Sequence, residues 1–137
     1  MRFIHGAILC GALLGSNVQA AAPCGSTLPG EKRVLENTRY QIAYRTEPQP
    51  VPVGAHFVVD FAVCPRNKAA APTAVRVDAN MPDHRHGMNY RPVVTTVSPG
   101  VYHAEGLLFH MPGRWDLTFD IVTGNTTQRL ASTLRIE

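Results

Sequence analysis

Charged residues are scarce in this sequence of 137 residues: Asp, Glu, Lys and Arg make up 17%, whereas hydrophobic residues make up 45%. This balance excludes an intrinsically disordered chain, which is poor in hydrophobic residues, and a coiled coil, which is rich in charged ones. The formal net charge is only +3 and the basic residues are scattered. A nucleic-acid-binding protein needs a dense basic surface to neutralise phosphates, so we expect no nucleic-acid partner.

Common catalytic motifs are missing as well. The sequence contains no Gly-rich phosphate-binding loop, no G-x-S-x-G nucleophile turn and no H-E-x-x-H zinc helix. Its carboxylates are spread along the chain and do not form pairs suited to acid–base catalysis. The sequence therefore predicts a protein that is not an enzyme.

A hydrophobic run long enough to span a membrane is also lacking. The run from Phe3 to Gly15 has thirteen residues, whereas a membrane helix needs about 20. Arg2 precedes this run and Ala20-Ala21-Ala22 follows it, which is typical of a cleaved signal peptide. We predict a signal peptide over residues 1–22, with cleavage after Ala20 as the alternative. The mature protein would be periplasmic and soluble, with no membrane span.

Cysteine is rare, with three residues in the whole chain. Cys10 falls in the predicted signal peptide, which leaves Cys24 and Cys64 in the mature protein. A pair of cysteines in an exported protein is most simply a disulfide. Closing a loop of about 40 residues would stabilise the fold by about 4 kcal/mol in the chain-entropy account. A pair of thiolate metal ligands is the alternative, which the wide separation and the oxidising compartment disfavour.

What the sequence does contain is typical of a β protein. Eleven Gly and eleven Pro argue against a helical bundle. Hydrophobic and polar residues alternate with period two, most clearly from Trp115 to Ile121. Residues 23–37 are polar and predict an N-terminal arm, and residues 38–137 predict one domain. We expect strands at about residues 39–45, 56–64, 73–79, 92–97, 101–109, 114–122 and 126–136.

About seven short strands separated by turns favour an all-β fold, an immunoglobulin-like antiparallel β-sandwich. A small closed barrel is the alternative.

One segment, Met81-Pro-Asp-His-Arg-His-Gly-Met88, is unusual for a sandwich loop. Alternate side chains of an extended backbone project to the same side, so His84, His86 and Met88 would face one point. A kink in the backbone would also bring Met81 to that point. Imidazole and thioether donors together favour copper, and the cuprous ion in particular.

Zinc is the less favoured metal, because it prefers Cys, His or carboxylate ligands and seldom takes methionine. Asp83 would add a carboxylate donor for zinc. Asp83 would otherwise form an ordinary surface ion pair with Arg85.

A second cluster, His110-Met-Pro-Gly113, follows the strand predicted at residues 101–109. The loops of a sandwich gather at its two ends, so this turn would lie over the first motif. His110 or Met111 would then complete a shell of three or four ligands. For Met111 alone, filling a gap in the core is an equally ordinary role.

The two motifs together resemble those of a known family. The run Val77–Val93 carries M-P-x-H-x-H-G-M, and Tyr102–Ile121 carries a later G-x-W-x-L strand. This pattern, over roughly residues 38–123, resembles the YtkA-like domain family. The resemblance implies an exported immunoglobulin-like sandwich linked to periplasmic copper handling. Carried over by position, it implies the metal ligands Met81, His84, His86, Met88, His110 and Met111.

We therefore expect a soluble periplasmic protein that binds copper and buffers it or passes it to a periplasmic or inner-membrane metalloprotein. A non-metal interaction module of a cell-envelope complex is the alternative. In that case His84 and His86 would hydrogen-bond to backbone groups and Met88 would pack inward. An accessory domain of an electron-transfer or oxidase assembly is a third hypothesis.

Overall fold

The computed structural model describes residues 19–137. Most of the predicted signal peptide lies outside these residues. Within the described range, no helix has the length and apolar character needed to cross a membrane.

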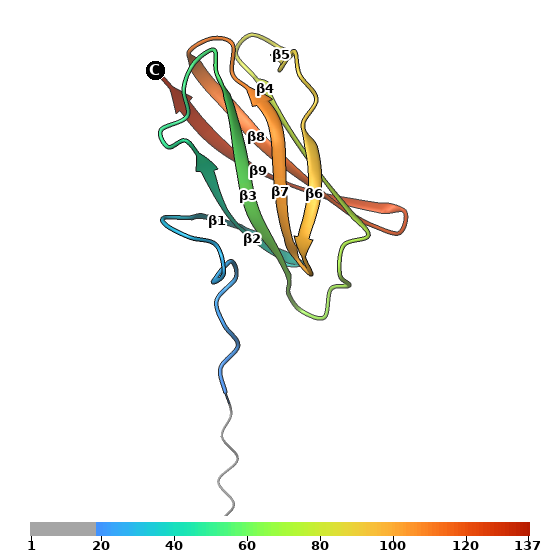
Figure 1. The fold of residues 1–137 in the computed structure, drawn as a ribbon. Coiled ribbons are helices and arrows are strands. Elements are labelled where there is room, and N and C mark those ends of the chain that lie inside the picture. The colour runs from blue at the N-terminus through green and yellow to red at the C-terminus, as the bar shows by residue number, and fades with distance from the viewer. Residues whose placement is uncertain (1–18) are drawn as a thin grey trace, which may run out of the picture.

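The described residues form nine β-strands and no helix (Figure 1). In chain order, the strands are β1 (Arg33–Glu36), β2 (Tyr40–Glu47), β3 (His56–Pro65), β4 (Ala74–Met81), β5 (His86–Gly87), β6 (Val93–Ser98), β7 (Val101–Leu108), β8 (Gly113–Thr123) and β9 (Thr126–Ile136).

The strands make two antiparallel sheets that pack face to face. One sheet has the order β1-β2-β3-β7-β6, and the other has the order β5-β4-β8-β9. In Figure 1 the first sheet lies in front of β8 and β9. This arrangement confirms the predicted all-β sandwich. The closed-barrel alternative is wrong, because the strands form two separate sheets in place of one continuous ring.

Two of the nine strands were not expected from the sequence. β1 lies inside the predicted N-terminal arm and pairs with β2, so that Val34 faces Ala43 across the pair. β5 pairs only with the end of β4, where His86 faces Met81. β1 has four residues and β5 has two, which is too short for hydrophobic alternation to reveal them. The arm is thus partly an edge of the first sheet.

The core lies between the sheets and is rich in aromatic rings. The side chains of Trp115, Leu117, Phe119 and Ile121 are fully buried, as the alternation along β8 predicts. Phe119 contacts Tyr44 and Phe61 of the opposite sheet, with ring centroids 5.3 and 5.2 Å away. Inward-facing aromatics from both sheets therefore fix how the sheets sit on each other.

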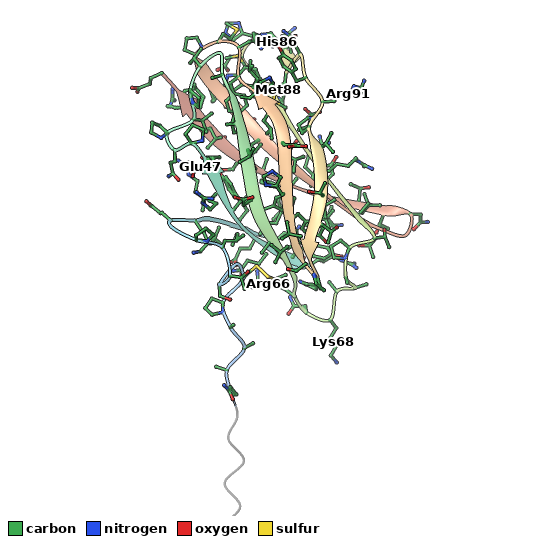
Figure 2. The ribbon with its side chains drawn as sticks, in the orientation of Figure 1. Glu47, Arg66, Lys68, His86, Met88 and Arg91 are labelled. Atoms are coloured by element: carbon green, nitrogen blue, oxygen red, sulfur yellow. A yellow bond between two sulfur atoms is a disulfide. The ribbon has the colours of Figure 1, made fainter. Side chains whose placement is uncertain are left out.

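A disulfide joins Cys24 to Cys64, as predicted, with 5.9 Å between the Cα atoms. It ties the segment before β1 to the end of β3. Figure 2 shows this bond near Arg66, at the end of the sandwich opposite His86. The disulfide is therefore separate from the His/Met motifs.

Candidate functional site

The first motif forms a tight hairpin between β4 and β5. The backbone N–H groups of His84 and Arg85 both donate to the carbonyl of Met81, at 3.2 and 2.9 Å. Arg85 has a φ of 57°, in the left-handed region. The backbone is therefore not extended between His84 and His86, and the expected simple alternation from His84 to Met88 is wrong. The hairpin leaves His84 exposed at its turn and His86 half-buried beside β4.

Arg114, at the start of β8, anchors this turn. Its Nε and Nη2 donate to the two carboxylate oxygens of Asp83, at 3.2 and 2.8 Å. These hydrogen bonds hold the pKa of Asp83 below its ordinary value, and the positive charge of Arg114 adds to the effect. The expected pairing of Asp83 with Arg85 is wrong, since Arg114 takes both oxygens. Zinc coordination by Asp83 would have to break this pair.

The second motif lies against the first. The ring centroids of His86 and His110 are 5.1 Å apart, and those of His84 and His86 are 5.8 Å apart. Two imidazoles that bind one ion through nitrogens about 2 Å from the metal have centroids roughly 5 Å apart. The rings of His86 and His110 are therefore close enough to share an ion when a nitrogen of each faces the other ring. The expectation that the turn after β7 approaches the β4–β5 hairpin is confirmed.

One ring nitrogen of His110, Nδ1, is buried without a hydrogen-bond partner among residues 19–137. A buried polar atom without a partner costs free energy of about 1–3 kcal/mol, so native proteins rarely leave one. In the imidazole tautomer that is protonated on Nε2, such an Nδ1 has a lone pair free for a metal ion. His86 differs, because its Nδ1 lies 3.1 Å from the carbonyl oxygen of Gly87.

The three methionines of the motifs take different positions. Met81 is fully buried in the core. Its terminal methyl would lie 2.6 Å from a Cβ placed on Gly113, so the first motif packs directly under the second. Gly113 has a φ of 130°, which side chains other than glycine rarely adopt, and a Cβ there would displace the end of Met81. Met88 and Met111 are partly buried against the core.

Figure 2 shows Met88 just below His86, at the same end of the sandwich. The backbone N–H of Met88 donates to the carbonyl of Ala79, at 3.3 Å, so Met88 continues alongside β4.

Trp115 contacts the histidines of both motifs, His86 and His110. This role was not predicted from the sequence. The ring of Trp115 stacks on Phe109 with a centroid distance of 4.5 Å. It meets His86 and His110 edge to face, at 6.0 and 5.4 Å. Its Nε1–H donates to the carbonyl of Met111, at 3.0 Å. The position of this tryptophan two residues after the H-M-P-G turn was the signal in the sequence.

The side chains of His84, His86 and His110 do not form a complete metal site from nitrogen and oxygen ligands alone. Within residues 19–137, no three His, Cys, Asp or Glu side chains are arranged to hold a metal. His84, His86 and His110 therefore do not converge on one point as they stand. A metal here needs methionine sulfur beside the His86–His110 pair, or a rotation of the His84 side chain.

The sequence model of the YtkA-like family matches residues 35–120. This chain belongs to the YtkA-like family. The match spans β2 to most of β8 and contains both His/Met motifs, as well as Trp115. No curated protein matches the chain significantly.

Solved structures with a similar fold are distant in sequence. A DUF4426 family protein from Pseudomonas aeruginosa PAO1 has a TM-score of 0.52 and 13% identity, over 77% of this chain and 94% of its own. The filamin domain of Lin-41 has a TM-score of 0.43 and 12% identity, over 69% of this chain and 91% of its own. The DUF4426 protein supports the sandwich fold of this YtkA-like protein.

Proposed function

We propose that this YtkA-like protein binds copper, and Cu(I) in particular, at the end of the sandwich where the two motifs meet. It buffers the ion or delivers it to another metalloprotein. His86 and His110 supply the nitrogen ligands, and the sulfur comes from one or two of Met81, Met88 and Met111. His84 adds a nitrogen when its side chain turns inward.

Two observations on one ring carry this proposal: His110 has a buried Nδ1 without a partner in the described part of the chain, and its ring centroid lies 5.1 Å from that of His86. A bound ion would satisfy that atom. Among residues 19–137, the donors of the two motifs are imidazole and thioether, and no free thiolate is present because both cysteines of this range, Cys24 and Cys64, are bonded to each other. Thioethers are soft ligands that select Cu(I), whereas zinc prefers thiolate, imidazole and carboxylate.

The same arrangement favours binding over catalysis. Asp83 is engaged by Arg114 and is not available as a general base beside the cluster. The proposal therefore assigns the site to storage or transfer of the ion, with no reaction step.

The predicted signal peptide and the disulfide both support export, and we propose the periplasm as the place of action. Disulfides persist in that compartment and are rare in the cytosol.

A competitive titration tests the proposal. Wild-type protein should compete for Cu(I) with a weaker chromogenic chelator such as ferrozine, with a submicromolar dissociation constant. The double variant His86→Ala/His110→Ala should bind at least about 100-fold more weakly, because it loses both nitrogen ligands. Zn²⁺ should bind the wild type more weakly than Cu(I) does.

His103→Gln is the matched control. His103 lies in β7 and its Nδ1 pairs with Asp60 at 2.7 Å, away from the cluster. The control should keep the wild-type affinity for Cu(I). Equal binding by the wild type and the His86→Ala/His110→Ala variant would remove the proposed site.

An interaction module without metal is the second candidate. Two observations favour it: Met88 and Met111 pack against the core, and His86 Nδ1 lies close to a backbone carbonyl. In that case the end of the sandwich would be a rigid contact surface of a cell-envelope complex. Absence of Cu(I) binding by correctly folded protein would favour this role.

A further inference from the structure

The three histidines of the site form a row with graded exposure. His84 is exposed, His86 is half-buried, and His110 has its Nδ1 buried. The centroid of His86 lies 5.8 Å from that of His84 and 5.1 Å from that of His110. The middle ring is thus close to both neighbours, and the row leads from solvent to the buried nitrogen.

The hairpin holds His84 at the outer end of this row. His84 belongs to the turn of residues 82–85, and two backbone hydrogen bonds to the carbonyl of Met81 close that turn. The ion pair of Asp83 with Arg114 fastens the same turn to β8. His84 is therefore presented to solvent by an anchored turn.

From this arrangement we infer that His84 is the exchange ligand of the site, through which Cu(I) enters and leaves. This inference rests on the proposed copper binding and assigns different roles within it. His86 and His110 hold the ion at equilibrium. His84 receives the ion from a donor protein, or shares it with an acceptor protein, while the ion passes between His86 and the outside ligand.

The physical reason is access. Transfer between two proteins by ligand exchange needs an intermediate in which the ion is bound to a ligand from each side. A buried nitrogen such as His110 Nδ1 cannot be reached by an outside ligand, whereas an exposed ring can.

Removing an exchange ligand slows both loading and release of Cu(I). The ratio of the two rate constants sets the dissociation constant, which therefore changes little. Removing a holding ligand weakens the affinity itself. The partner would be a protein that presents its own soft nitrogen or sulfur ligands to this end of the sandwich.

Stopped-flow transfer of Cu(I) to excess bathocuproine disulfonate tests the inference. In the second arm, apo-protein is loaded from the weaker Cu(I)–ferrozine complex. In His84→Ala, both rates should fall by about fivefold or more while the dissociation constant stays within about threefold of wild type. In His110→Ala, the dissociation constant should rise at least about tenfold and release should become faster. His84→Met, which puts another soft ligand at the exposed position, should recover most of the exchange rate.

Each outcome is decisive. Wild-type rates in both directions for His84→Ala would overturn the exchange role, and so would a loss of affinity equal to that of His110→Ala. Failure of His84→Met to transfer faster than His84→Ala would also contradict a role as ligand. If the wild type binds Cu(I) and only the His84 arm fails, the proposed function stands without this inference. If the wild type binds no Cu(I), both fall.

Discussion

Replacement of Trp115 by alanine is expected to lower the free energy of unfolding by about 4 kcal/mol, as is typical for removing a large buried aromatic ring. Trp115 is fully buried and stacks on Phe109. The variant would also lose the hydrogen bond to the carbonyl of Met111 and the edge-to-face contacts with the rings of His86 and His110. Urea-induced unfolding, followed by circular dichroism, measures the loss.

Trp115→Phe separates the two roles of this side chain. Phenylalanine keeps an aromatic ring in the core but cannot donate to the carbonyl of Met111. We expect a loss of about 1–3 kcal/mol, from the smaller ring and the unsatisfied carbonyl. Cu(I) should bind more weakly than to the wild type, because the turn that carries His110 and Met111 is no longer fixed. Stability and Cu(I) affinity equal to those of the wild type would show that Trp115 does not position this turn.

Removal of the disulfide should have an effect of similar size. The double variant Cys24→Ser/Cys64→Ser is expected to lose about 4 kcal/mol, because a sequence separation of 40 closes a long loop in the unfolded chain. Small domains are stable by only about 5–15 kcal/mol, so much of the folded population would be lost on mild heating. Thermal and denaturant unfolding of oxidised wild type and variant give the difference.

The disulfide experiment has two controls. Wild-type protein unfolded under reducing conditions should match the double variant. At a temperature where the variant is folded, its Cu(I) affinity should equal that of the wild type, since the disulfide lies at the opposite end of the sandwich from His86 (Figure 2). A loss below about 1 kcal/mol would show that the disulfide adds little constraint to the unfolded chain.

Most of the fold could be predicted because its long strands bury one face each. The alternation from Trp115 to Ile121 identifies β8, since that side of the strand is fully buried and the other is not. β1 and β5 escaped prediction for the opposite reason. β1 is a short edge strand whose Val34 is 56% exposed, and its place in the sheet comes from backbone pairing with β2. Side-chain pattern carries no information about such a strand.

The candidate site could be predicted in outline only. That the two motifs meet at one end followed from the way sandwich loops gather, and the approach of His86 to His110 confirms it. The partner of Asp83 is 31 residues away in the chain, so the local sequence pointed to Arg85 in its place. The burial of His110 Nδ1 depends on how the motifs pack on Trp115, which no local pattern specifies.

Copper K-edge X-ray absorption of the Cu(I)-loaded protein tests the central claim most directly, because it reports the atoms bound to the ion. We predict a mixed shell with imidazole nitrogen and at least one sulfur, in which the imidazole signal falls in His86→Ala/His110→Ala. A shell without sulfur, or an imidazole signal that persists unchanged in this variant, would contradict a His/Met copper site at the meeting point of the two motifs.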